Sequence, residues 1–163
     1  MSVVRIRKIS EDDIWLLFNW VNDHEVRKWS FQHSRPITES EHKQWFYSKL
    51  VDQNVRQWVM EEDDRPCGQV RFERIDSRIV LHYSIAAEFR GRKLAVKMLN
   101  LTVEETLKEW LGLAIYAYTF TENYASRKSL LKAGFRENSI QERSICFVYD
   151  RGPTAPYADK VLV

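Results

Sequence analysis

The sequence of 163 residues lacks the features that mark several classes of protein. It has only two cysteines, Cys67 and Cys146, and no CxxC pair, so we expect two buried thiols rather than a disulfide framework or a metal site. No apolar run is long enough to cross a bilayer and no apolar segment follows Met1, so the sequence predicts a cytoplasmic protein without a membrane partner. The formal net charge of only +2 argues against a general nucleic-acid-binding protein.

Apolar periodicity divides residues 1–151 into strands and helices. In chain order the patterns predict one strand, two helices, three strands, a helix, a strand, a helix and two final strands. This order predicts a single α/β (α+β) domain, with a mixed but mostly antiparallel sheet of about seven strands flanked by about four helices. Residues 152–163 contain two prolines and no periodicity, so we expect a C-terminal tail there.

Short polar signals predict where helices begin and end. Ser10 and Thr38 are each followed three residues later by an acidic residue, which is the pattern of a capping box at a helix start. Gly112 and Gly134 each follow an apolar-periodic run and are placed to end a helix. The stretch NDHE, residues 22–25, is expected to end the first helix.

The stretch AEFRGRKLAVKML, residues 87–99, lies between a predicted strand and a predicted helix that begins near Arg92. It places four cations, Arg90, Arg92, Lys93 and Lys97, around one glycine. Free N–H groups and the dipole at a helix start favour a phosphate group, although a solvated turn has a similar composition. The stretch contains neither the GxxxxGK(S/T) phosphate loop nor the GxGxxG dinucleotide fingerprint.

Two motifs together resemble one known family. FRGRKLAVKML resembles the Arg/Gln-x-x-Gly-x-Gly/Ala pyrophosphate loop of the GNAT N-acetyltransferase superfamily, with Arg90 in its first position and Ala95 in its last. NYASRKSLLKAGF, which begins at Asn123, resembles the Asn-x-x-Ser/Ala…Gly-Phe helix that follows the fifth strand of that superfamily. The motifs stand in the superfamily's order, with one predicted helix and one predicted strand between them. By this resemblance the chain is identified as a member of the GNAT superfamily.

The resemblance implies an enzyme that uses acetyl-CoA as a co-substrate and needs no metal. Strands four and five would splay apart, and the pantetheine arm would enter between them and pair with backbone groups like an added strand. The residues that the resemblance assigns to the cofactor are Ser84, Ile85, Ala86, Arg90, Gly91, Arg92, Lys93, Leu94, Ala95, Asn123, Ser126 and Arg127.

The chain departs from the superfamily pattern at two positions. Lys93 stands where most members have glycine, and a left-handed backbone there would cost a lysine about 1–2 kcal/mol. We therefore expect helical dihedral angles at residue 93, with backbone N–H groups carrying the phosphates. Leu130 stands where many members have a tyrosine that acts as general acid toward the leaving thiolate. Either Tyr83 or Tyr124 replaces it, or the thiolate leaves without a protein acid.

Alternation along the strand at residues 79–85 sorts the catalytic candidates. Tyr83 is our leading candidate to hold a water or the thiolate, and a backbone N–H near Ile85 would stabilise the oxyanion. His82 points to the opposite face and is interpreted as a core or helix-facing residue. Glu73, near the end of the preceding strand, is the carboxylate considered next. A water relay would suffice as base, because an amine on an oxygen-rich ring has a pKa nearer 8 than that of lysine.

The N-terminal half is similar to a GNAT subgroup that acetylates nucleotide-linked amino sugars, in stretches such as NDHEVRKWSF and EHKQWF. Aromatic faces suit sugar rings and bases, and arginine suits a diphosphate. For each of the aromatic residues, core packing is an equally good interpretation. The residues assigned to the acceptor are Trp20, Asn22, Arg27, Trp29, His42 and Trp45.

The sequence therefore predicts an N-acetyltransferase that moves an acetyl group from acetyl-CoA to a primary amine by direct attack, with a nucleotide-linked amino sugar as acceptor. Two alternatives stay open: a GNAT enzyme that acetylates a protein N-terminus, a small amine or an antibiotic, and a non-catalytic acyl-CoA-binding module. An RNA-binding domain is disfavoured, since the chain lacks a charge surplus and the aromatic motifs of the known modules. The sequence is compatible with a homodimer.

Overall fold

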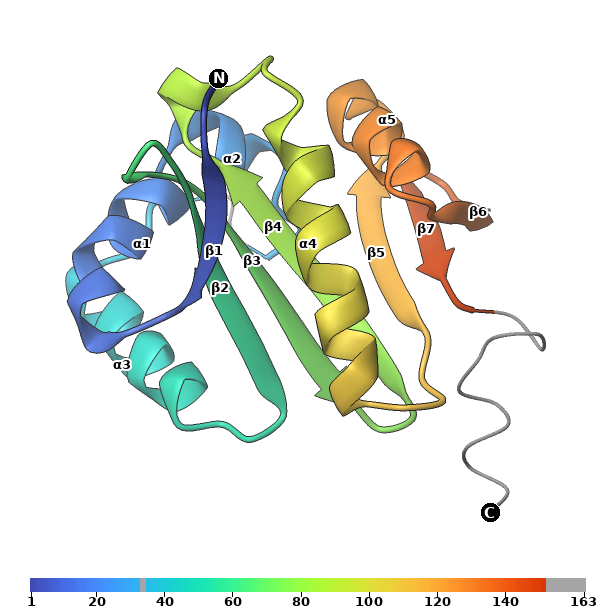
Figure 1. The fold of residues 1–163 in the computed structure, drawn as a ribbon, viewed down its shortest axis with the longest axis horizontal. Helices are drawn as coiled ribbons and strands as arrows, with labels where there is room; N and C mark the ends of the chain where they lie inside the picture. Colours follow the sequence, from blue (N-terminus) through green and yellow to red (C-terminus); the bar gives the residue numbers. More distant parts are fainter. Residues whose placement is uncertain (33–34, 152–163) are drawn as a thin grey trace.

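The computed structural model describes residues 1–32 and 35–151, which form helices packed on one sheet (Figure 1). The predicted tail, residues 152–163, lies outside the described residues. The strands are β1 (Val4–Lys8), β2 (Val55–Glu62), β3 (Arg65–Ile75), β4 (Arg78–Ile85), β5 (Ile115–Phe120), β6 (Arg136–Gln141) and β7 (Ser144–Tyr149). The helices are α1 (Ile14–Val21), α2 (His24–Lys28), α3 (Glu39–Leu50), α4 (Leu94–Glu109) and α5 (Tyr124–Lys132), with short 3-10 turns at Glu11–Asp13 and Ala87–Phe89.

The seven strands form one sheet in the order β1-β2-β3-β4-β5-β7-β6. β4 and β5 pair in parallel, and the other neighbouring strands pair antiparallel. The predicted α/β domain with a mixed, mostly antiparallel seven-stranded sheet is therefore confirmed. Five α-helices occur among the described residues, one more than predicted.

The additional helix, α2, begins inside the stretch NDHE. Asp23 caps it, because its carboxylate accepts a hydrogen bond from the backbone N–H of Val26 at 3.1 Å. α1 ends at Val21, so the stretch does interrupt the first helix as predicted. The same stretch also contains an aspartate, which is a favoured N-cap residue, and a new helix begins directly after it. For that reason the predicted number of helices was one too low.

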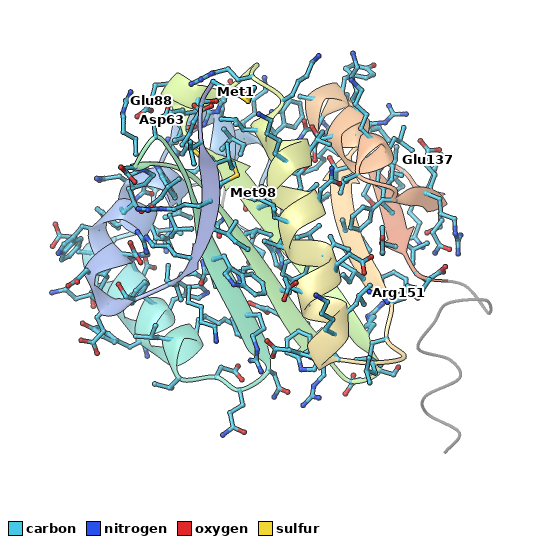
Figure 2. The ribbon with its side chains drawn as sticks, in the orientation of Figure 1. Met1, Asp63, Glu88, Met98, Glu137 and Arg151 are labelled. Carbon is cyan, nitrogen blue, oxygen red and sulfur yellow. The ribbon has the colours of Figure 1, made fainter. Side chains whose placement is uncertain are left out.

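Alternate residues of β2 pack on opposite faces of the sheet. Trp58 and Met60 belong to the larger core, which the central strands share with α4 and α5. Met98, labelled in Figure 2, projects from α4 into this core and has no exposed surface. Val59 belongs to a smaller core with residues of α1 and with Phe46 of α3. The sheet thus lies between two helical layers, with α4 and α5 on one face and α1 and α3 on the other.

Several local predictions are confirmed. Cys67 and Cys146 are buried and form no disulfide. Both capping boxes are present, at Ser10 and at Thr38. Gly134 follows the end of α5 with a φ of +95°, a left-handed angle that glycine adopts without steric cost.

Within residues 1–32 and 35–151, no helix combines the length and the apolar character needed to span a bilayer. Nor does this part of the chain bring three or more His, Cys, Asp or Glu side chains together in a way that would hold a metal ion.

Candidate active site

β4 and β5 separate after a short stretch of pairing. Ile79–Leu81 of β4 pair with Ile115–Ala117 of β5, although β4 runs on to Ile85 and β5 to Phe120. Figure 1 shows the two strands diverging on either side of α4. The predicted splay between strands four and five is therefore present, and it leaves an open strand edge along the end of β4.

Backbone alternation decides which groups of β4 face this opening. The N–H of Ile79 donates to a carbonyl just before β5 at 3.0 Å, whereas the N–H of Ala86 donates to a carbonyl of β3 at 2.9 Å. Odd-numbered residues of β4 therefore direct their N–H groups toward β5. Tyr83 and Ile85 do so at the point where β5 has turned away.

This alternation corrects the predicted pairing of the cofactor arm with Ser84, Ile85 and Ala86. The N–H of Ala86 is bonded to β3, and its carbonyl accepts from the N–H of Phe89 at 2.9 Å. Ser84 faces β3 in the same way, since no bulge interrupts the register between β3 and β4. Of the three residues only Ile85 turns its backbone into the opening, and Tyr83 joins it there.

The loop between β4 and α4 ends in a left-handed residue. Lys93 is the N-cap of α4 with φ +60° and ψ +17°, so the prediction of helical dihedral angles at this position is wrong. Gly91 also has a positive φ, of +77°. The chain needs both left-handed residues to turn from the end of β4 into the axis of α4, and at Lys93 this costs about 1–2 kcal/mol. Leu94 and Ala95, the first residues of the helix, line the resulting cleft.

Arg90 and Arg92 direct their guanidinium groups to carboxylates of other elements. Arg90 Nη2 lies 2.5 Å from Asp23 Oδ1, and Arg90 Nε donates to the carbonyl oxygen of Ile85 at 3.1 Å. Arg92 Nη2 lies 2.7 Å from a carboxylate oxygen of the buried Glu62 on β2. The backbone N–H groups of the loop, rather than these two side chains, are thus left to face a diphosphate.

The start of α5 forms the opposite wall of the opening. Asn123 caps this helix by accepting a hydrogen bond from the N–H of Ser126 at 3.2 Å, and both residues line the cleft. Ser126 Oγ lies 2.8 Å from the hydroxyl oxygen of Tyr83. Burial raises the pKa of Tyr83 to about 12, against the opposing effect of this hydrogen bond, so the phenol stays protonated at neutral pH.

Two predicted residues of α5 lie away from the cleft. Tyr124 is 70% exposed, and the guanidinium of Arg127 lies 5.5 Å from the centre of its ring. Arg127 Nη1 donates to the carbonyl oxygen of Thr121 at 2.8 Å and so holds the turn between β5 and α5. Neither residue is among the described residues that line the cleft. Of the predicted residues at the start of α5, only Asn123 and Ser126 therefore border the cleft.

The opening continues as a cleft of about 1320 Å³ with walls from both faces of the sheet. Tyr83 lines it from one face, and His82 and Glu73 line it from the other. Because the cleft passes through the gap between β4 and β5, strand alternation does not exclude His82 from it. As predicted, His82 lies on the face opposite Tyr83, which α1 and α3 cover, and from there it also lines the cleft.

A group of charges surrounds His82. Arg71 Nε lies 2.7 Å and Lys49 Nζ 3.0 Å from the same carboxylate oxygen of Glu73. Burial acts to raise the pKa of Glu73, but the two cations outweigh it and lower that pKa. Burial, together with Arg71 and Lys49, lowers the pKa of His82 to about 4. At neutral pH Glu73 is thus an ionised carboxylate already paired with two cations, whereas His82 is a neutral imidazole that can accept a hydrogen bond from an amine.

Three of the predicted acceptor residues, Trp20, Trp29 and Trp45, line the cleft. Phe31 and Arg35 line it too; Phe31 belongs to the stretch NDHEVRKWSF that carried the resemblance, whereas Arg35 was not predicted. Phe31 stands close to Trp29 in the run WSF, and this aromatic pair was the available signal. Arg35 is placed by its ion pair with Glu41, at 2.6 Å, and no local pattern marks it.

The other three predicted acceptor residues hold the protein together instead. The side-chain amide of Asn22 bonds both the N–H and the C=O of Ile37, at 2.7 and 3.0 Å, and Arg27 Nε donates to the carbonyl oxygen of Asn22 at 3.2 Å. Neither Asn22 nor Arg27 lines the cleft. His42 borders it but is 2% exposed, and its Nε2–H donates to the carbonyl oxygen of Ile14 at 2.7 Å. Burial lowers the pKa of His42, so this residue is a neutral core histidine.

Comparison with known proteins agrees with this geometry. Residues 4–136 match the family model described as an acetyltransferase (GNAT) domain. The chain belongs to the GNAT acetyltransferase family. None of the curated proteins is significantly similar to it in sequence.

Solved structures share the fold of this GNAT acetyltransferase at low sequence identity. Aminoglycoside acetyltransferase AAC(6')-Ib in complex with coenzyme A has a TM-score of 0.77 and 18% identity, over 91% of this chain and 95% of that one. Spermidine N-acetyltransferase from Vibrio cholerae, in complex with CoA and spermine, has a TM-score of 0.78 and 19% identity, over 90% and 94%. A domain from Methanocaldococcus jannaschii DSM 2661 has a TM-score of 0.78 and 20% identity, over 91% and 99%. Similarity at this level supports the fold.

Family membership makes the chain an N-acetyltransferase that depends on acetyl-CoA. The site fits this cofactor in two respects. The backbone of Tyr83 and the N–H of Ile85, whose carbonyl oxygen already accepts from Arg90, form an open edge for the amides of an extended arm. At Gly91, an added Cβ would find no atom within 4 Å, so the loop leaves open space where a diphosphate can approach the backbone closely.

Gly91 and Gly112 provide a matched test of this loop. Both are left-handed, with φ of +77° and +78°, and in both an added Cβ would meet nothing within 4 Å. Gly112, however, follows the far end of α4, whereas Gly91 lines the cleft. We expect Gly91→Ala and Gly112→Ala each to lower the free energy of unfolding by about 1–2 kcal/mol. Only Gly91→Ala should weaken acetyl-CoA binding in titration calorimetry, and equal affinities in both variants would contradict the assignment.

Proposed function

We propose that this GNAT acetyltransferase acetylates a primary amine on a small acceptor of sugar type, and that the acceptor is a nucleotide-linked amino sugar. We call the part of the cleft on the face of the sheet that carries His82 and Glu73 the acceptor half. The observation that carries the proposal is that most acidic residues of this half are already paired with cations. The aromatic side chains that line the same half also support it.

The carboxylates of the cleft are largely neutralised within the protein. Three carboxylates line it among the described residues, Glu25, Glu41 and Glu73. Glu73 is paired with two cations and Glu41 with Arg35, which leaves Glu25 without a Lys or Arg partner among the described residues. A polycationic acceptor such as spermine or an aminoglycoside needs several unpaired carboxylates, because burying an unpaired ammonium is costly. The site therefore favours an acceptor that is neutral or anionic apart from its reacting amine.

The aromatic rings indicate what kind of body that acceptor has. Trp20, Trp29, Phe31 and Trp45 line the cleft, and Phe31 also stacks on Phe120 with ring centres 4.1 Å apart. Flat aromatic faces bind the C–H faces of sugar rings and stack on nucleobases. An acceptor with a sugar ring and a base matches these walls better than a flexible aliphatic polyamine does.

The proposed reaction is direct transfer. The amine nitrogen attacks the thioester carbonyl carbon, the N–C bond forms, and the C–S bond breaks to release the CoA thiolate. The N–H of Ile85 faces the opening and is placed to stabilise the oxyanion. His82 accepts a hydrogen bond from the neutral amine and orients it, and water in the cleft carries away the proton. On the opposite face of the sheet, the protonated phenol of Tyr83 donates a hydrogen bond to the departing thiolate.

A substrate panel tests the proposal. The enzyme is incubated with acetyl-CoA and, separately, with UDP- and CMP-linked amino sugars, the corresponding free amino sugars, kanamycin, spermidine and short peptides. Free thiol is followed over time, and products are identified by mass. We expect turnover with at least one nucleotide-linked amino sugar, and kcat/KM at least tenfold below that value for kanamycin and spermidine.

The alternatives are distinct outcomes of the same panel. Turnover of peptides or of polyamines, with none of any sugar, would replace the sugar proposal with the corresponding amine class. Binding of acetyl-CoA without turnover of any amine would indicate a non-catalytic acyl-CoA-binding module. In either case the amino-sugar proposal is wrong.

A further inference from the structure

A second cavity, of about 290 Å³, adjoins the acceptor half of the cleft. Its lining includes Arg78, Tyr116, Tyr118 and Ser144. Tyr118 and Ser144 also line the main cleft, so the two spaces adjoin at these residues.

Strand register places this cavity on the same face as His82. β4 and β5 pair through Val80 with Tyr116, and the core residues on either side of this pair point to the opposite face, toward α4. The even-numbered side chains of β4 and β5 therefore form a row on the face that carries His82. This row runs from His82 and Tyr118 past Tyr116 to Arg78. His82 and Arg78 are four residues apart, which at a rise of about 3.3 Å per residue corresponds to roughly 13 Å along the strand. An acceptor whose amine lies at His82 and which reaches Arg78 must be longer than a single sugar ring.

Arg78 contacts two tyrosines and forms no ion pair with a carboxylate of the described residues. Its Nη1 donates to the hydroxyl of Tyr118 at 3.3 Å, and its guanidinium lies 5.9 Å from the centre of the Tyr116 ring. No carboxylate of the described residues lies within ion-pair distance of it, unlike Arg71 and Arg90 in the main cleft. A guanidinium held by tyrosines and lacking a carboxylate binds phosphate readily, through two parallel N–H···O bonds.

Tyr118 adds a surface for a ring. Its side chain is 43% exposed and stands at the junction of the two cavities. A nucleobase next to a phosphate would stack on this face while the phosphate meets Arg78.

We propose that the second cavity is the subsite for the nucleoside-phosphate part of the acceptor, with Arg78 binding phosphate and Tyr118 stacking on the base. This inference rests on the proposed function, since it assigns a place to the part of the acceptor that a free amino sugar lacks. It makes Arg78 a specificity-determining residue that does not touch the reacting atoms.

Arg74 gives a matched control for Arg78. Both flank the turn between β3 and β4, but the Arg74 guanidinium lies 5.6 Å from the Trp110 ring, which belongs to the core on the α4 face. Arg74→Gln and Arg78→Gln therefore remove the same charge from opposite faces of one hairpin. Thermal unfolding of both variants verifies that each is folded.

The kinetic test uses the nucleotide-linked amino sugar that the panel identifies and its free amino-sugar counterpart, at saturating acetyl-CoA. We expect Arg78→Gln to raise KM for the nucleotide-linked acceptor roughly 10- to 100-fold, as is usual for a lost charged hydrogen bond, and to leave kcat nearly unchanged. The KM of the free amino sugar should not move, and Arg74→Gln should match the wild type on both acceptors. An unchanged KM of Arg78→Gln for the nucleotide-linked acceptor would overturn the subsite and leave the proposed function standing.

A binding test separates the subsite from the choice of acceptor. UDP is titrated calorimetrically into the wild type and into both variants, each saturated with acetyl-CoA so that the cofactor site is filled. We expect UDP to bind the wild type and Arg74→Gln, and to bind Arg78→Gln at least tenfold more weakly. Absence of binding to the wild type, or equal binding to Arg78→Gln, overturns the subsite. If the panel finds no sugar acceptor, UDP binding that is lost in Arg78→Gln still supports a nucleoside-phosphate site.

Discussion

Replacing Tyr83 by phenylalanine should lower turnover roughly 10- to 100-fold and leave the affinity for acetyl-CoA nearly unchanged. With a pKa of about 12, the Tyr83 phenol holds its proton more tightly than an ordinary thiol does, so it stabilises the thiolate by donating a hydrogen bond rather than by giving up the proton. A hydrogen bond to a charged group contributes about 1.5–3 kcal/mol, which sets the expected range. Single-turnover release of free thiol measures the chemical step, and calorimetry measures cofactor binding.

Tyr124→Phe is the matched control, since it removes the same hydroxyl from a ring that is 70% exposed and outside the cleft. It should leave turnover unchanged. Ser126→Ala should have a smaller effect than Tyr83→Phe, because it leaves the Tyr83 hydroxyl in place and removes only the Ser126 Oγ at 2.8 Å from it. Wild-type turnover by Tyr83→Phe would show that the thiolate leaves without this residue, and the role proposed for Tyr83 would be wrong.

Features that depend on local periodicity were predictable from the sequence. Alternation along β4 correctly put Tyr83 and His82 on opposite faces, and the capping patterns at Ser10 and Thr38 correctly marked helix starts. The motif that begins at Asn123 correctly placed this residue at the start of a helix, where its side chain caps α5. Such signals involve residues within a few positions of one another, so the sequence alone contains them.

Side-chain partners from distant elements were not predictable in this way. Arg90 bonds Asp23, which is 67 positions away, and Asn22 holds the backbone of Ile37, 15 positions away. The family resemblance assigned Arg90 to the cofactor and Asn22 to the acceptor. Only the folded arrangement shows that each of these side chains is hydrogen-bonded to a distant part of the chain.

Lys93 was misjudged because its local backbone preference was outweighed by the shape of the whole site. A lysine disfavours left-handed angles, but the end of β4 and the axis of α4 are fixed by core packing, and Lys93 adopts the φ that joins them. The strand face of His82 was predicted correctly, but that face alone did not show that His82 lines the cleft, which takes walls from both faces of the sheet. The gap between β4 and β5 is set by where their pairing ends, and no single strand shows that.

Replacing Gly68 by valine should cost about 3 kcal/mol of stability and also weaken acetyl-CoA binding. Gly68 lies on β3 opposite Ile85, at the open edge of β4. An added Cβ would lie 2.9 Å from the carbonyl oxygen of Ser84 and 2.8 Å from Cδ1 of Ile85, and the sulfur of Met98 lies just beyond, at 3.5 Å. The side chain can turn aside, but the backbone oxygen moves only if β4 shifts away from β3. Overpacking of this kind typically costs about 1–3 kcal/mol, and the two additional methyl groups of valine place the variant at the upper end.

The double variant Gly68→Val with Ile85→Val separates the two contacts. Ile85→Val removes Cδ1 and relieves the side-chain contact, but the contact with the Ser84 oxygen persists, so stability should recover only in part. Chemical denaturation gives the free energies of unfolding, and calorimetry gives the affinity for acetyl-CoA. Because the shift displaces the edge that carries the Ile85 N–H, affinity should remain reduced even where stability is partly restored. If Gly68→Val were as stable as the wild type, or bound acetyl-CoA equally well, then the close approach of β3 and β4 at Gly68 would not be what positions this edge for the cofactor.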